Sequence, residues 1–79
     1  MTIEIRLFAT LAEFLPPGSR SGTAILDVPD ASRVADVIES LGIPSTLPCI
    51  VLVNGEDTDT DRSLTAGDVV SLFPPLAGG

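Results

Sequence analysis

The sequence has 79 residues, of which 44% are hydrophobic, so it predicts one small domain with its own core. It contains one cysteine and no histidine, which excludes internal disulfides, the common zinc sites and the usual serine–histidine and cysteine–histidine nucleophile pairs. Eleven acidic residues oppose four arginines and no lysine, and the resulting net charge of −7 argues against nucleic acid as a partner.

The N-terminal part of the chain predicts two strands. Side chains alternate strictly over residues 2–8, which is typical of a strand with one buried face. The buried face carries Ile3, Ile5 and Leu7, and the other face carries Glu4, Arg6 and Phe8. A short helical turn over 9–15, a loop with glycine and proline, and a second strand over 23–28 follow.

The single predicted helix covers residues 33–41. Its apolar residues recur with the spacing i, i+3, i+4 and i+7, which places them on one stripe that faces a sheet. These residues are Val34, Val37, Ile38 and Leu41. The side-chain oxygen of Asp30 or Ser32 is expected to cap the start of the helix.

Three strand signals follow in the C-terminal half. The run 49–53 is almost continuously apolar, which indicates a strand covered on both sides or central in a sheet. A tight turn at Asn54-Gly55 leads into an acidic stretch over 56–68 that should hold a short strand and a turn. The last strand covers 69–73. The predicted fold is therefore α+β, a mixed sheet of four to five strands with one main helix packed on one face.

The C-terminal end carries the most specific pattern of the sequence. After Gly67-Asp68 and the last strand, the chain reads Phe73-Pro74-Pro75, then Leu76, Ala77 and Gly78-Gly79. Together with the β-β-α-β-β order and "VNG" at 53–55, this end resembles the ubiquitin-like β-grasp sulfur carriers of the MoaD/ThiS family. The resemblance is greatest to the small subunit of molybdopterin synthase. It covers the whole chain and implies a β-grasp domain over 1–74 and a flexible tail over 75–79.

The resemblance also implies a chemistry for the last glycine. In such carriers an activating enzyme uses ATP to adenylate the terminal carboxylate, here that of Gly79, and sulfur then replaces AMP to give a thiocarboxylate. The sulfur passes to a small molecule in a partner, which would be the large subunit of molybdopterin synthase or another sulfur-accepting enzyme. The chain would be a carrier rather than an enzyme, with no bound cofactor or metal and with ATP used by the activating enzyme.

The end residues have properties that suit this role. Gly78 and Gly79 lack a Cβ, so their backbone can enter a narrow channel. Ala77 keeps the chain thin, and Pro74 and Pro75 favour an extended stem.

Two phenylalanines are candidates for partner binding. Alternation from the buried faces places Phe8 and Phe73 on the face of the sheet without the helix. With Leu76 nearby, they would form a docking patch for a partner. The other explanation is that the loop over 9–22 simply covers this part of the sheet.

Two further patterns have plainer explanations. The spacing of Asp57, Asp59, Asp61 and Asp68 matches a calcium loop, but the glycine of that loop is missing, so an acidic turn in solvent is favoured. Cys49 could relay sulfur, although a lone cysteine that opens an apolar strand is more often a small buried hydrophobe.

The sequence is also compatible with other functions. Thiamine thiazole synthesis or another sulfur-transfer pathway is the alternative within the class. A ubiquitin-like protein modifier, joined to its target through Gly79, and a plain β-grasp interaction module with an inert tail are alternatives outside it. No segment resembles a signal peptide or a membrane span, so we expect a cytoplasmic protein without membrane contacts.

Overall fold

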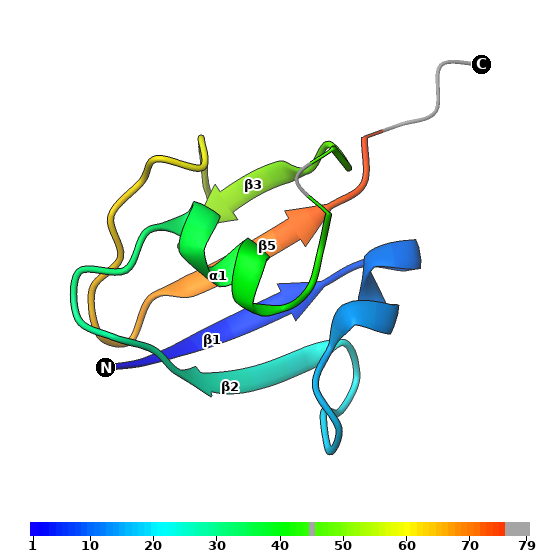
Figure 1. Cartoon of the computed structure of the whole chain (residues 1–79), viewed down its shortest axis with the longest axis horizontal. Helices are drawn as coiled ribbons and strands as arrows, with labels where there is room; N and C mark the ends of the chain where they lie inside the picture. Colours follow the sequence, from blue (N-terminus) through cyan, green and yellow to red (C-terminus); the bar gives the residue numbers. More distant parts are fainter. Residues whose placement is uncertain (45, 76–79) are drawn as a thin grey trace.

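The computed structural model describes residues 1–44 and 46–75 of the chain. Its elements are β1 (Thr2–Leu7), the 3-10 helix η1 (Ala9–Phe14), β2 (Thr23–Asp27), α1 (Val34–Ser40), β3 (Ile50–Val53), β4 (Glu56–Thr58) and β5 (Val69–Phe73). Figure 1 shows α1 lying across one face of the sheet, so the predicted α+β fold is confirmed. None of the helices in these residues is long and apolar enough to cross a bilayer.

The five strands form one mixed sheet in the order β2-β1-β5-β3-β4. β1 and β5 are parallel neighbours, whereas the other neighbouring strands are antiparallel. The register pairs Ile5 with Val70 and Leu7 with Leu72. Because partners in register point to the same face, the buried residues of the two strands form one continuous apolar surface under α1.

The core lies between this surface and α1. The inward residues of β1 and β5 are at most 2% exposed, as their alternation predicts; they are Ile3, Ile5, Leu7, Val70 and Leu72. The helix buries Val34 and Val37 fully, while Ile38 and Leu41 pack against the core and stay partly exposed. The predicted stripe is thus confirmed, but its C-terminal half lies closer to the surface.

The start of α1 differs from the prediction. Neither Asp30 nor Ser32 caps the helix, and the Oγ of Ser32 instead donates to the carbonyl of Pro29 at 2.6 Å. The N-cap residue is Arg33, whose backbone N–H donates to Oδ2 of Asp36 at 2.9 Å. A carboxylate within the first turn therefore satisfies this donor, as in one half of a capping box.

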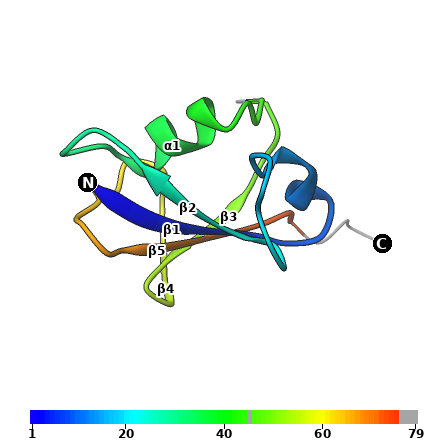
Figure 2. The same ribbon diagram turned by 90° about the horizontal axis from the view of Figure 1, so that it is seen from below.

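The strand β3 decides between the two alternatives predicted for the run 49–53. It is an inner strand, between β5 and β4, but it begins at Ile50 rather than at Cys49. Only Val51 and Val53 are buried, and Ile50 is 43% exposed. The prediction of a strand central in the sheet is therefore confirmed, whereas its alternative, cover on both sides, does not apply, because the helices of the described residues lie on one side of the sheet, as Figure 2 shows.

Candidate functional site

Phe8 and Phe73 lie together on the face of the sheet opposite α1. Phe8 follows β1, and its backbone N–H donates to the carbonyl of Leu72 at 3.2 Å, which extends the pairing with β5. The two rings are stacked, with 4.2 Å between their centroids and 7° between their planes. Phe8 is 39% exposed and Phe73 is half-buried, so the placement inferred from alternation is confirmed.

The segment after β1 leaves this aromatic pair open. Its 3-10 helix η1 buries Leu11 in the core and lies on the same side of the sheet as α1 (Figure 2). A loop that covered the pair would have buried Phe8. The exposure of Phe8 therefore favours a docking role over the alternative explanation.

Ile50 enlarges the apolar surface around the pair. It is the register partner of Phe73 on the neighbouring strand β3, and partners in register share a face of the sheet. We call the surface formed by Phe8, Phe73 and Ile50 the aromatic patch. Ile50 was not among the predicted site residues, because the almost continuously apolar run 49–53 gave no sign of an exposed face. Alternation with the buried Val51 and Val53 would have found it.

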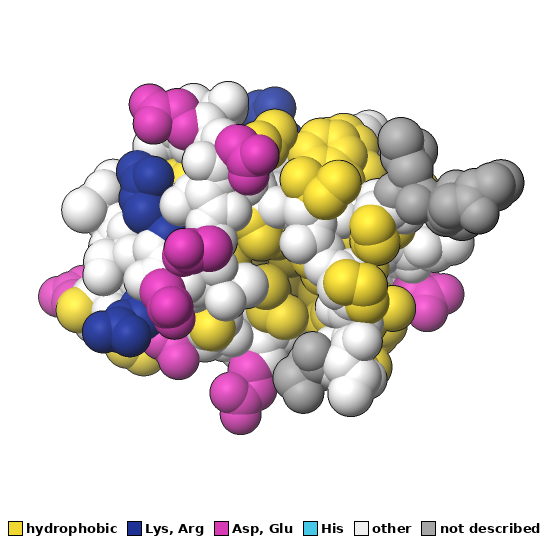
Figure 3. All heavy atoms as spheres, turned by 90° about the horizontal axis from the view of Figure 1, so that it is seen from above, with side chains coloured by type: hydrophobic (Ala, Val, Ile, Leu, Met, Phe, Trp, Pro, Cys, Tyr) yellow, Lys and Arg dark blue, Asp and Glu magenta, His cyan; other side chains and the backbone are white. Residues whose placement is uncertain are grey.

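The chain leaves the domain beside the aromatic patch. After Phe73 comes the half-buried Pro74 and then the exposed Pro75. Leu76, Ala77, Gly78 and Gly79 lie outside the described residues, so their roles and the division into 1–74 and 75–79 stay predictions. Figure 3 shows that hydrophobic side chains gather toward the end of the molecule where β5 finishes, while most charged side chains lie toward the other end.

A polar cluster holds the opposite end of β5. Oδ2 of Asp68 accepts the backbone N–H of Thr65 at 2.8 Å, and Oδ1 accepts the Thr65 hydroxyl at 3.1 Å and the Asn54 amide at 3.0 Å. Oδ1 of Asn54 in turn accepts the N–H of Val69 at 2.9 Å. "VNG" and Gly67-Asp68, two stretches that carried the family resemblance, thus meet in space and tie the turn after β3 to the start of β5.

These contacts also determine the direction in which the pKa of the Asp68 carboxyl is shifted. Its burial acts to raise the pKa, but the hydrogen bonds from Thr65 and Asn54 and the positive charge of Arg62 outweigh burial and hold the pKa below its ordinary value. Asp68 is 8% exposed, and its oxygens are taken up by protein donors. Within residues 1–44 and 46–75, no group of three His, Cys, Asp or Glu side chains could hold a metal ion together.

Cys49 lies just before β3 and is half-buried. Its Sγ lies 3.7 Å from the carbonyl oxygen of Leu47, and burial raises the pKa of the thiol. A raised pKa keeps the thiol protonated at neutral pH, and a protonated thiol is a poor nucleophile. The surroundings of Cys49 therefore do not favour a sulfur relay.

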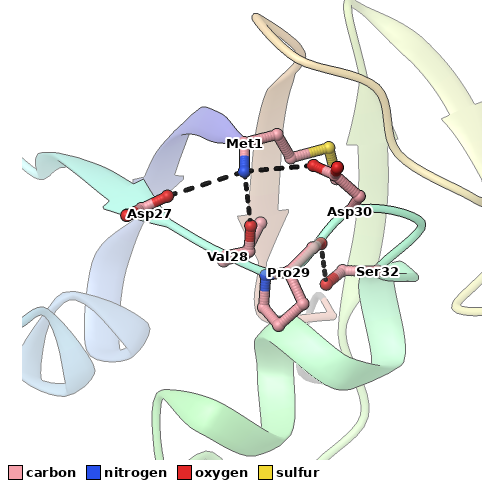
Figure 4. Close-up of polar contacts among 6 residues, drawn as sticks. All are labelled: Met1, Asp27, Val28, Pro29, Asp30 and Ser32. Atoms are coloured by element: carbon pink, nitrogen blue, oxygen red, sulfur yellow. Dashed lines mark hydrogen bonds and ion pairs between the residues drawn. The ribbon is translucent and has the colours of Figure 1, made fainter.

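The amino group of Met1 is engaged by the loop between β2 and α1 (Figure 4). It donates to the carbonyl of Val28 at 2.7 Å and lies 3.5 Å from Oδ1 of Asp27 and 3.3 Å from Oδ1 of Asp30. Three oxygen atoms thus surround this amino group, and the sequence has no lysine that would add a side-chain amine.

The chain is similar to one protein family and to several solved structures. The profile of the Mut7-C ubiquitin family matches residues 1–77, whereas no curated protein sequence matches significantly. The crystal structure of small archaeal modifier protein 1 from Haloferax volcanii is 33% identical, with a TM-score of 0.75 over 100% of both chains. The HVO 2177 protein of Haloferax volcanii is 34% identical, with a TM-score of 0.78 over 100% of this chain and 87% of that one.

A more distant structure shares the fold. It is a chain of the complex of subunits 1 and 2 of molybdopterin-converting factor from Helicobacter pylori, 22% identical, with a TM-score of 0.63 over 100% of both chains. The ubiquitin-like β-grasp fold that the sequence resemblance implied is thereby confirmed.

Proposed function

Because the chain belongs to the Mut7-C ubiquitin family, a ubiquitin-like group, we propose that it is a sulfur carrier that acts through the carboxylate of Gly79. An activating enzyme transfers AMP from ATP to this carboxylate and releases pyrophosphate. Sulfur from a donor then displaces AMP and leaves a thiocarboxylate, which delivers the sulfur within a partner protein. The chain itself is not an enzyme in this scheme, and molybdopterin biosynthesis is the pathway that we propose.

The observation that supports this proposal most strongly is that β5 ends in the aromatic patch, so the chain leaves the domain there. β5 is held between β1 and β3, ends at Phe73 in the aromatic patch, and continues through Pro74 and Pro75. A partner bound to the aromatic patch would receive the last four residues at its own surface. Fully extended, these residues reach about 14 Å beyond Pro75, which suits an active site set back from the docking surface.

The aromatic patch and the charge of the chain describe the partner. The Helicobacter pylori complex pairs two subunits of molybdopterin-converting factor, and we propose a corresponding large subunit as the sulfur acceptor here. Its docking surface should be apolar where it meets Phe8 and Phe73. The net charge of −7 predicts that basic residues surround this apolar contact.

The test of the chemistry is the mass of the chain after incubation with its activating enzyme, ATP and a sulfur source. Replacement of one oxygen by sulfur at Gly79 should add about 16 Da, because adenylation turns a poor leaving group into a good one. Deleting Gly79 withdraws the carboxylate by up to ~3.6 Å and should abolish the product without affecting the fold. Gly78→Val should have the same effect through its bulk.

A matched control is the intact chain with the enzyme but without ATP, which should keep its original mass. The proposal is wrong if the intact chain is never thiocarboxylated by any activating enzyme encoded beside it. It is equally wrong if a chain with one residue appended after Gly79 still delivers sulfur without being trimmed.

A second candidate is a protein modifier, joined through Gly79 to a lysine of its target. The 33% identity with small archaeal modifier protein 1 favours it. The chain has no lysine, so a second copy of it offers no lysine acceptor and the acceptor lysine belongs to another protein. Adducts that withstand both hydroxylamine and thiols, and that disappear when Gly79 is deleted, would support this function over sulfur delivery alone.

A further inference from the structure

A second apolar surface lies beside α1, on the side of the sheet away from the aromatic patch. It is a groove of about 570 Å³ between the C-terminal half of α1 and the segment that leads into β3. The apolar residues that line it are Ala35, Ile38, Ile43, Pro44, Leu47, Pro48 and Cys49. This size and this lining are those of sites that receive side chains of a ligand or a partner.

Two parts of the groove belong firmly to the fold, its floor and the side formed by Thr60. Ile43 is 3% exposed, so the floor of the groove belongs to the core. The carbonyl of Thr60 accepts the N–H of Ala35 at 2.9 Å, which holds the segment after β4 against the start of α1. In contrast, Leu47 is 41% exposed and offers its side chain to solvent at the rim. The groove thus combines a buried floor with an accessible apolar edge.

The border of the groove is acidic. Glu39 lines it directly, and the exposed Asp59 and Asp61 flank Thr60, which also lines it. None of the lining residues is basic. In Figure 3 hydrophobic side chains occupy a hollow in the middle of this face, and acidic side chains stand along one side of it. Such a border attracts cations and repels anions within a Debye length.

This charge distinguishes the candidate occupants. A second copy of the chain would bring another net charge of −7 to an acidic border. The chain's own last residues, Leu76 to Gly79, contain no cation. A segment with apolar side chains next to arginine or lysine complements both the floor and the border.

From these features we infer that the groove docks a partner segment in which apolar side chains alternate with or adjoin basic ones. The groove also adjoins the aromatic patch through the chain, because Cys49 lines the groove and the next residue, Ile50, pairs with Phe73. A partner that holds the aromatic patch can therefore reach around the start of β3 into the groove. Docking in the groove does not depend on the chemistry of Gly79.

Cys49 provides a direct measure of occupancy, since it is the single cysteine and lines the groove. We suggest measuring the rate at which N-ethylmaleimide alkylates the full chain in the presence of blocked tetrapeptides. The sequence RLLR should slow alkylation, by about two-fold at a concentration equal to its Kd, because half of the grooves are then filled. The charge-reversed ELLE and the polar RSSR should protect much less, and added salt should weaken protection by RLLR.

Matched variants separate the groove from the rest of the surface. Leu47→Ser should weaken binding of RLLR about five-fold, whereas Ile25→Ser, on the opposite face and 63% exposed, should not change it. Glu39→Gln should weaken binding about two-fold, whereas Glu13→Gln, on η1, should have no effect. The rate of each variant without peptide serves as its reference, and its far-UV circular dichroism shows whether it folds.

Three outcomes would overturn the inference. Equal protection by RLLR and ELLE would remove the role of the acidic border. No protection by RLLR up to its solubility limit would show that the groove does not take such a segment. Protection that rises with the concentration of the chain alone, and is lost in Leu47→Ser, would assign the groove to a second copy. None of these results bears on thiocarboxylation of Gly79, which is measured separately.

Discussion

Replacing Asp68 by asparagine should weaken the fold more than the loss of one surface charge would. Three donors converge on this buried carboxylate, at 2.8 and 3.1 Å from Thr65 and at 3.0 Å from Asn54. Asparagine keeps the shape of the side chain, but its own NH₂ group must face at least one of these donors. A buried donor left without an acceptor costs about 1–3 kcal/mol, which is the expected loss in the free energy of unfolding.

Thermal unfolding followed by far-UV circular dichroism is the suitable assay, because the chain has neither tryptophan nor tyrosine as a fluorescent probe. For a domain of this size, each kcal/mol lowers the Tm by about 4–8 °C. Asp57→Asn is the matched control, since Asp57 is exposed on β4 and should leave the Tm unchanged. Asn54→Gly should test the other side of the contact, because glycine tolerates the φ of 53° found at Asn54.

The pH dependence supplies an independent test. The pKa of Asp68 in the fold lies below its ordinary value, so the stabilisation by its ionised form is complete above that ordinary value and is lost as the pH falls through the folded pKa. The difference in stability between the natural chain and Asp68→Asn should be constant from about pH 7 to about pH 5 and shrink below about pH 4. An equal Tm at neutral pH, or a difference that persists undiminished in strong acid, would refute the reasoning.

Three further predictions concern the core, the aromatic patch and one loop. Leu72→Ala should lower the free energy of unfolding, measured in urea titrations, by about 2–5 kcal/mol, because Leu72 is fully buried. Leu41→Ala should lower it clearly less, since Leu41 is partly exposed. Equal losses in the two variants would contradict this reasoning. Phe73→Ala should cost about 0.5–1.5 kcal/mol of stability for the lost stacking, plus part of the roughly 1.5–3 kcal/mol of a fully buried ring, because Phe73 is half-buried. The same variant should weaken binding of a sulfur-accepting partner about ten-fold or more in calorimetry, and global unfolding would instead make Phe73 a core residue. Gly22→Ala should lower the Tm more than Gly18→Ala. Both glycines have a positive φ, but of the two only Gly22 has a backbone carbonyl oxygen 3.1 Å from the position of an added Cβ. The reverse order of Tm values would be evidence against this explanation.

The sequence by itself predicted the fold and, for most strands, which side chains face the core. Strict alternation over 2–8 and 69–73 assigned Ile5, Val70 and Leu72 to the core, and all three are buried. The spacing of Val34 and Val37 likewise identified the face of the helix. These inferences succeed because the periods of a strand and a helix are local properties, and one buried face is what a small α+β domain requires.

Only the tertiary structure decided which distant residues meet. Three contacts depend on the position of β5 between β1 and β3. They are the stacking of Phe8 on Phe73, the pairing of Ile50 with Phe73 and the hydrogen bond between Asn54 and Asp68. The N-cap of α1 was also not predicted correctly. The hydroxyl of Ser32 donates to the carbonyl of Pro29, and the carboxylate of Asp36 accepts the backbone N–H of Arg33. Local patterns indicate which face a side chain takes, but register between strands and competition among hydrogen-bond partners are settled only once the whole chain has packed.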